Sequence, residues 1–331
     1  MLRKWTKTAL LAATTAAFLL AAGTFTSCSN GSSNGSSSTV LEISGDVLVK
    51  CYNENIPSDG FIEIPDGVTT IGEWAFYWCT NLKNVKIPDS VTTIGNWAFQ
   101  ECYDLMSVTI PDSVTTIGNE AFYMCYDLRS VTIPDSVTTI GNEAFRATGL
   151  TSVKIGNGVT SIGKGAFQIC LSLTSVTIPD NVTSLGYEAF YNCESLTSVT
   201  IGSGVTSIGN SVFLNCKSLT SVKIGNGVTS IGKGAFERCE SLTSVTIPDN
   251  VTSIGYEAFY KCESLTSVTI GSGVTSIEER AFSNCYNLTS VTFTDKEGWH
   301  KGYGEEIDVT DPAKNATNLT YTNSSSYKKT T

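Results

Sequence analysis

Cysteine is the residue type of this chain with the greatest capacity for chemistry, since eleven occur in 331 residues. In an exported protein such thiols can form disulfides or bind a metal ion. Equivalent residues of stacked strands lie ~4.8 Å apart with parallel side chains, whereas a disulfide requires Cβ atoms ~3.8 Å apart. We therefore predict free, buried thiols that pack as small apolar groups, and no metal site. Besides Cys28 and Cys51, the cysteines share one position of a repeat: Cys79, Cys102, Cys125, Cys170, Cys193, Cys216, Cys239, Cys262 and Cys285.

Residues that catalysis would need at unique positions do not stand out. The one histidine, His300, follows the repeats, and we interpret it as structural. The sequence contains no unique carboxylate pair, Gly-rich phosphate loop or nucleophile elbow. Each Ser, Cys, Asp or Glu of the repeats has near-copies in other repeats, whereas a catalytic site needs singular positions. We predict no enzyme, no catalytic residue and no cofactor.

A repeated Ile-Gly step organises the chain and positions the cysteines. It recurs every 23 residues, with one interval of 22, and this period is typical of a solenoid. Each copy also carries a Val, an Ala-Phe pair, a Leu and a Val-x-Ile segment, which form the predicted core columns. One unit cannot cover its own apolar side, so the units must stack in register. The aligned residues are Ile71, Ile94, Ile117, Ile140, Ile162, Leu185, Ile208, Ile231, Ile254 and Ile277.

The spacing within a repeat predicts its elements. Val108 and Ile110 alternate with polar residues, which predicts a strand, and Pro111-Asp112 ends that strand as a turn. The apolar residues of 98–105 recur at intervals of three or four, the spacing of a short helical turn. Residues 91–94, which precede this helical turn, are predicted to form a short extended segment that turns a corner.

The segment from Leu82 to Cys102 carries the pattern L-x-x-V-x-I-P-x-x-V-T-x-I-G-x-x-A-F-x-x-C. This pattern resembles the BspA-like, or treponemal, class of bacterial leucine-rich repeats over about residues 62–293. The resemblance implies a right-handed, curved leucine-rich-repeat solenoid of about ten 23-residue repeats, mainly β with short helical turns and with end caps. It also implies a cell-surface protein that acts as an adhesin for host extracellular-matrix proteins. The pattern predicts the fold but not the ligand.

Residues 1–28 are predicted to be an export signal. Basic residues precede an apolar run over 9–22, which is too short and wrongly flanked for a membrane span. In one interpretation Cys28 is a lipid-modified cysteine, and the Ser/Gly/Asn-rich segment 29–38 is a flexible tether. In the other, cleavage follows Gly23 and the protein is released. The interpretation with a lipid-modified Cys28 places the protein on the outer surface of a bacterial cell, attached to the membrane only through a lipid anchor.

Removal of the signal makes the chain more acidic. The full chain has 21 basic and 31 acidic residues, and loss of Arg3, Lys4 and Lys7 leaves 18 against 31, a net charge of −13. Such a charge argues against binding to nucleic acid or to anionic lipid.

Segments at both ends depart from the repeat. Residues 39–61 are predicted to form an N-terminal cap that contains a hairpin turning at Gly45-Asp46. Residues 294–331 are predicted to form a C-terminal cap with a frayed tail from Ser324. The array, 62–293, lies between them and contains a 69-residue internal duplication, in which 153–167 is identical to 222–236. We expect a monomer.

The solvent side of the predicted strands contains Lys and Arg but no acid between Leu82 and Thr292. One interpretation is that Thr is simply a good solvated strand residue. The other is a docking face for extended or acidic protein partners, with a basic end. The residues predicted to form this face are Lys83, Lys86, Met106, Arg129, Lys154, Thr177, Thr200, Lys223, Thr246 and Thr269.

Aromatic residues gather on the variable positions around the helical-turn segment. They either cover the outer side of these turns or form a surface that binds protein or sugar. These residues are Tyr77, Trp78, Trp97, Tyr103, Tyr123, Tyr126, Tyr187, Tyr191, Tyr256, Tyr260 and Tyr286.

Repeats without singular chemical positions favour protein binding over catalysis, and the predicted role is adhesion to host or neighbouring-cell proteins. The alternative from a different class is a passive structural surface protein without a high-affinity ligand. Uniform Ser and Thr columns favour weak, repeated contacts.

Overall fold

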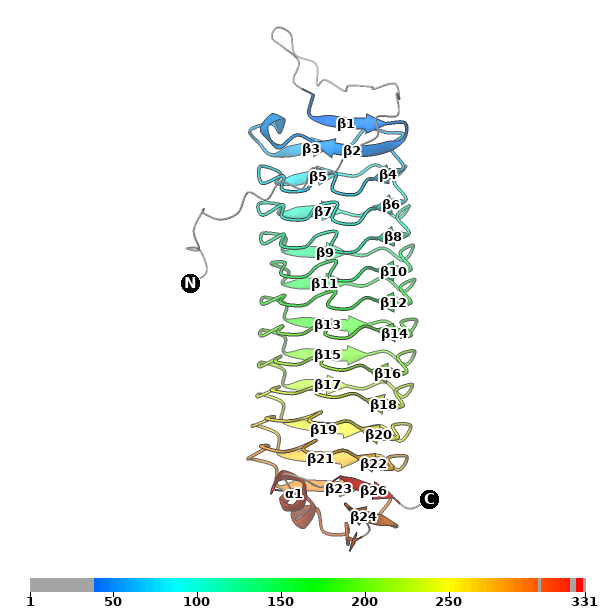
Figure 1. Ribbon diagram of the computed structural model, residues 1–331, viewed down its shortest axis with the longest axis vertical. Helices are drawn as coiled ribbons and strands as arrows, with labels where there is room; N and C mark the ends of the chain where they lie inside the picture. The colour runs from blue at the N-terminus through cyan, green and yellow to red at the C-terminus, as the bar shows by residue number, and fades with distance from the viewer. Residues whose placement is uncertain (1–38, 303–304, 322–325, 330–331) are drawn as a thin grey trace.

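The computed structural model of the chain describes residues 39–302, 305–321 and 326–329. There the chain winds as a β-solenoid whose turns follow the 23-residue repeat, which confirms the predicted fold class. Figure 1 shows the turns stacked along an axis that is straight in this view, from a hairpin at one end to a helix at the other. The predicted signal and tether, 1–28 and 29–38, lie outside the described residues.

Each repeat contributes one strand to a first ladder, which we call the strand face. Inward-pointing Val108 and Ile110 are buried, while Ser107 and Thr109 are exposed, as the alternation predicts. Paired strands run parallel with equivalent residues opposite each other. The strands are β3 (Phe61–Glu63), β5 (Asn84–Lys86), β7 (Ser107–Thr109), β9 (Ser130–Thr132), β11 (Ser152–Lys154), β13 (Ser175–Ile178), β15 (Ser198–Ile201), β17 (Ser221–Lys223), β19 (Ser244–Ile247), β21 (Ser267–Ile270) and β23 (Ser290–Phe293).

A second ladder of two-residue strands turns the corner of each repeat, where the sequence predicts a short extended segment. Its Ile residues are buried and its strands pair in parallel. The strands are β4 (Thr70–Ile71), β6 (Thr93–Ile94), β8 (Thr116–Ile117), β10 (Thr139–Ile140), β12 (Ser161–Ile162), β14 (Ser184–Leu185), β16 (Ser207–Ile208), β18 (Ser230–Ile231), β20 (Ser253–Ile254) and β22 (Ser276–Ile277).

The third side of each repeat, which we call the turn side, is a run of β-turns. Spacing predicted a short helical turn here, but within the described repeats no helix is assigned to this side. Trp97 and Glu101 have left-handed φ angles of 55° and 60°, which interrupt an α-helix. Alternate N–H groups then donate to the next repeat, as from Phe99 to the Ala121 carbonyl over 2.8 Å. In a helix these groups would bond within their own segment.

Phenylalanines form the centre of the core. The side chain of one Phe per repeat, from Phe76 to Phe282, is fully buried. Their rings stack nearly parallel, with centroids 4.7 Å apart at Phe76 and Phe99 and 5.5 Å apart at Phe190 and Phe213. The predicted Phe column is therefore confirmed as the core spine.

The ten described cysteines are free and buried, as the ladder spacing predicts. Their thiols also make hydrogen bonds that the apolar interpretation did not include. The Cys102 thiol donates to the Phe76 carbonyl of the preceding repeat over 3.0 Å. In the fourth repeat Thr148 takes the cysteine position and donates to the Phe145 carbonyl over 2.9 Å. The position therefore accepts a small side chain that can donate a hydrogen bond.

An antiparallel hairpin stands at the N-terminal end, with its turn at Gly45-Asp46 as the sequence predicts. It consists of β1 (Leu41–Ser44) and β2 (Val47–Cys51), followed by the short 3-10 helix η1 (Asn53–Asn55). β2 also pairs in parallel with β4, with Leu48 opposite Ile71. The hairpin thereby continues the corner ladder by two strands.

The C-terminal end consists of a small antiparallel sheet and a helix. Its elements are β24 (Trp299–Lys301), β25 (Glu305–Glu306), α1 (Pro312–Tyr321) and β26 (Tyr327–Lys329). The buried Trp299 ring meets Phe293 edge-on at 4.8 Å between centroids. Where we expected a frayed tail, Tyr327 is buried and pairs with Ile277 of β22.

Candidate functional site

The ten residues predicted to form the docking face all lie on the solvent side of the strand face. Seven of them share one column in register, for example Thr177, Thr200 and Lys223 on adjacent strands. Lys83, Met106 and Arg129 occupy the column just before the strands. Lys83, Thr200 and Thr269 are half-buried and the others are exposed. The periodicity therefore places these residues on one surface.

The predicted basic end of this face consists of Lys83, Lys86, Arg129 and Lys154, and two of these four residues are neutralised by ion pairs. Lys86 Nζ lies 2.6 Å from Glu63 Oε1, and this hydrogen bond raises the pKa of Lys86. Arg129 pairs with Asp127 at 3.0 Å. Glu63 lies just before the segment for which the sequence shows no acid. Exposed pairs of this kind contribute little to stability, but they reduce the charge available to a partner.

Lys154 and Lys223 remain as exposed cations of the same column. Neither forms an ion pair with any residue that the structure describes. The exposed cations of the strand face without an ion pair therefore lie in its middle, while Lys83 at the N-terminal end is half-buried.

Hydroxyl groups in the neighbouring column serve the fold itself. Thr174 Oγ1 donates to the Thr151 carbonyl over 3.2 Å, and Thr197 Oγ1 donates to the Thr174 carbonyl over 2.9 Å. For this column the structure supports the interpretation that Thr is a good strand residue. The column of Lys154 and Lys223 is the better candidate for recognition.

A hollow of about 600 Å³ opens on the strand face around Lys223. Polar side chains from three strands and their turns line most of it. Lys223 and Asp249 give the hollow one charge of each sign, and Ser244, Thr246 and Thr269 supply hydroxyl groups. Such a surface is suited to the main chain and polar side chains of an extended partner.

The hollow lies where the strand face is interrupted. β13, β15 and β17 form one sheet and β19, β21 and β23 form the next, so adjacent β17 and β19 do not pair. Val222 on β17 is half-buried, whereas its equivalents Val199 and Val245 are 2% and 4% exposed. The missing pairing leaves room beside Lys223.

The turns on the two sides of this interruption differ. β17 leads into Gly225-Asn226-Gly227, whereas β19 leads into Pro248-Asp249. A Cβ atom at Gly227 would lie 1.8 Å from the Ser203 carbonyl oxygen, so only glycine permits this close approach to the preceding repeat. A glycine turn therefore sits against the repeat before it. The turn type is not the whole cause, because β7 and β9 also do not pair although both lead into Pro-Asp turns.

We call the unpaired step between β17 and β19 a junction, and the internal duplication places an equivalent junction between β11 and β13. β11 ends at Lys154, leads into Gly156-Asn157-Gly158, and does not pair with β13. Val153, the counterpart of Val222, is also half-buried. Both lysines were predicted from the sequence, but the missing strand pairing beside them was not. At both junctions an Ile-Gly-Asn-Gly turn is followed, one repeat later, by an Ile-Pro-Asp turn.

The described residues contain no group of three or more His, Cys, Asp or Glu side chains arranged to hold a metal ion. None of the described helices has the length and hydrophobicity of a membrane span. Cys28, the predicted lipidation site, lies outside the described residues.

A solenoid of 23-residue turns with parallel strands on one side and turns on the other defines the class of leucine-rich-repeat proteins. The family model described as the BspA type leucine-rich repeat region matches residues 50–173 and 160–289. The chain belongs to this family of bacterial surface proteins, whose repeats generally mediate protein interaction.

Solved structures are similar to the chain as well. A leucine-rich cell-surface protein of Faecalibacterium prausnitzii shares 31% identity over 72% of this chain and 79% of its own, with a TM-score of 0.43. A leucine-rich-repeat protein of T. pallidum shares 28% identity over 59% of this chain and 82% of its own, with a TM-score of 0.44. One from Bacteroides ovatus shares 24% identity over 83% and 94%, with a TM-score of 0.35. No curated protein matches the chain.

Proposed function

We propose that this chain is a cell-surface binding module, not an enzyme, and that its strand face docks an extended segment of a partner protein. The observation that carries the proposal is the pair of equivalent, unpaired lysines at the two junctions, Lys154 and Lys223. A strongly acidic protein that keeps such cations on one column has an electrostatic contrast that can orient a partner.

The spacing of the two junctions limits what the partner can be. Three repeats separate Lys154 from Lys223, and at ~4.8 Å per stacked strand the lysines lie ~14 Å apart. An extended chain spans that distance in about four residues. We therefore infer a partner segment with acidic residues about four positions apart. Binding at both positions would raise the affinity through effective concentration.

Adhesion is the proposed role, with host extracellular-matrix proteins or proteins of neighbouring cells as partners of the monomeric array. The proposed layout is an export signal at 1–28, a tether at 29–38, caps at 39–61 and 294–331, and acylation of Cys28. Mass spectrometry of the N-terminal peptide tests the anchor. A diacyl or triacyl adduct on Cys28 is expected, whereas a free N-terminus at Thr24 would indicate a released protein.

Binding itself is tested with a soluble chain from Thr39 and a panel of purified matrix proteins in biolayer interferometry. We expect saturable binding to at least one of them that weakens as salt rises, because exposed charges are screened. Absence of binding to every member of the panel would favour the alternative, a passive surface scaffold.

A further inference from the structure

Four tyrosine rings on the turn side have a cation of this same chain above them. Arg146 lies over Tyr123 at 5.4 Å, and Lys164 lies over Tyr187 at 5.8 Å, measured to the ring centroid. Tyr256 and Tyr260 are covered in the same way by Lys233 and Lys261, and both by Arg280. In each of these pairs a cation of the chain itself interacts with the negative face of the ring.

The aromatic cluster of the first two repeats consists of three rings in mutual contact. Trp74 and Trp97 stack with centroids 4.5 Å apart, and Tyr77 meets Trp74 edge-on at 5.2 Å. Trp74 is 44% and Tyr77 46% exposed. Across the described part of the chain, no Lys or Arg lies over any of these three rings.

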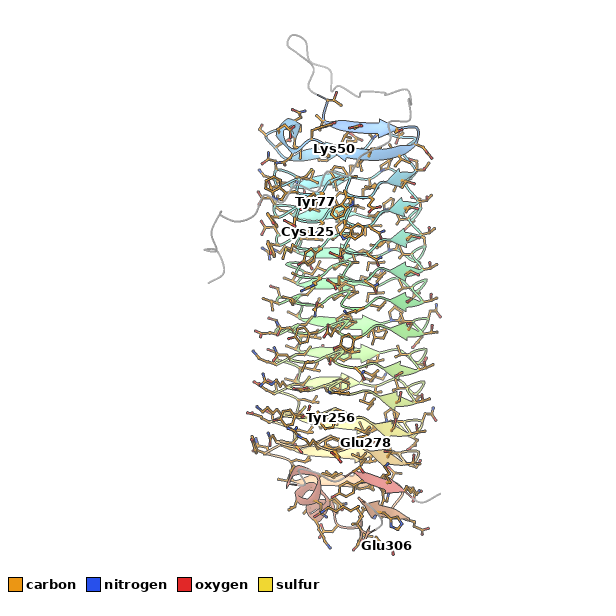
Figure 2. The ribbon with its side chains drawn as sticks, in the orientation of Figure 1. Lys50, Tyr77, Cys125, Tyr256, Glu278 and Glu306 are labelled. Carbon is orange, nitrogen blue, oxygen red and sulfur yellow. The ribbon has the colours of Figure 1, made fainter. Side chains whose placement is uncertain are left out.

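This cluster borders a cavity of about 780 Å³ between the hairpin and the first repeat. Figure 2 shows Lys50 and Tyr77 near this end of the stack. The cavity is mainly apolar, and Trp74 and Tyr77 are its aromatic wall. Its charged lining residues are Glu42, Glu73 and Lys50, and the Lys50 ammonium already lies over the Tyr52 ring at 4.6 Å.

Carboxylates surround the open rings. Glu73 Oε1 accepts a hydrogen bond from Trp74 Nε1 over 3.1 Å, which fixes the indole beside an acid. Burial, and then the carboxylate of Glu101, raise the pKa of Tyr77. Neither Glu42 nor Glu73 forms an ion pair within the described ranges. Ring faces and carboxylates together favour a cation, and the one lysine that lines the cavity, Lys50, already lies over Tyr52.

The fold does not require tryptophan at these positions. Trp74 and Trp97 occupy a left-handed position that recurs in every repeat, and later repeats fill it with Glu, Gly, Ser or Arg. Ser211 and Glu188, for example, take the same backbone conformation. Aromatic side chains therefore occur here for a reason other than backbone geometry.

We propose that the cavity and its open aromatic cluster bind a lysine or arginine side chain presented by a partner peptide. The cation would lie against Trp74 and Tyr77, which line the cavity, with Trp97 stacked behind Trp74 and the charge balanced by Glu73 and Glu42. This site is separate from the strand face and does not depend on the function proposed for Lys154 and Lys223.

Isothermal titration calorimetry of tetralysine into the full chain tests this site. We expect saturable binding that Trp74→Ser weakens about tenfold, as loss of a desolvated cation–π contact would. This change leaves the net charge unaltered, and Ser211 shows that the backbone position accepts serine. Glu73→Gln should also weaken binding, whereas Lys50→Gln should strengthen it by removing a competing cation.

Tyr286→Ser is the matched control, because Tyr286 is 72% exposed and lies near the other end of the array. It should leave tetralysine binding unchanged, as should Lys223→Glu. Trp97→Ser provides a second test of the cluster, and circular dichroism checks that each variant is folded. Equal affinity of the unchanged chain and both tryptophan variants would show general attraction to an acidic protein and overturn the proposal.

Discussion

Raising the pH from about 8 to about 10 is expected to unfold the array. Burial raises the pKa of Cys170 to about 11 and of Cys216 to about 12, above the ordinary value of 9.0. The pKa values of Cys102, Cys193 and Cys239 are raised for the same reason. Unfolded thiols therefore lose protons that the folded state retains, so stability is present below about pH 9 and is lost above it.

The expected loss is large because the shift recurs along the column. Each thiol contributes about 1.4 kcal/mol per pH unit once the unfolded form is ionised. Several such thiols together reach a slope on the order of 10 kcal/mol per pH unit. Guanidinium unfolding at several pH values, under reducing conditions, measures the slope directly.

One substitution isolates the contribution of the thiols from that of other alkaline groups. Cys193→Thr should keep a hydrogen-bond donor at the position, following Thr148, and remove one titrating group. Its slope should therefore be smaller by about 1.4 kcal/mol per pH unit. An unfolding free energy that does not change between about pH 8 and pH 10 would contradict the buried thiol column.

Truncation of the phenylalanine stack is expected to have the second large effect. Phe190 is fully buried between Phe167 and Phe213, with ring centroids 5.2 Å and 5.5 Å away. Phe190→Ala should lower the free energy of unfolding by about 3–5 kcal/mol, because it leaves a cavity between rings that cannot close on each other. Guanidinium unfolding at neutral pH checks this value.

Tyr187→Ala serves as the control, since this ring lies in the same repeat but is 43% exposed. Its effect should stay below about 1 kcal/mol. If both variants lost the same stability, the spine would not be the main source of cohesion between repeats.

Much of the fold follows from the sequence because the same columns return in every repeat. Val108 and Phe99 could be assigned to the core from period alone, and both are buried. The turn side could not be distinguished from a helical turn, because successive β-turns also return apolar residues every three or four positions. The difference depends on left-handed residues such as Glu101 and on hydrogen bonds to the next repeat.

The candidate sites were less predictable, because they depend on contacts between segments. Periodicity placed Lys223 on the strand face, but the hollow beside it lies where β17 and β19 do not pair, which periodicity does not indicate. The pairing of Lys86 with Glu63 required the register of β3 and β5. The aromatic cavity depends on how the hairpin packs beside Trp74, which no local pattern specifies.

Charge reversal at the two junctions tests the central claim most directly. Lys154→Glu with Lys223→Glu changes the strand face, and Lys164→Glu with Lys233→Glu is matched to it in charge, exposure and spacing on the turn side. Affinity for the matrix protein that binds the unchanged chain should be measured for both double variants. We predict at least about a tenfold loss for the strand-face pair alone. Equal affinity of the two double variants would contradict docking on this face.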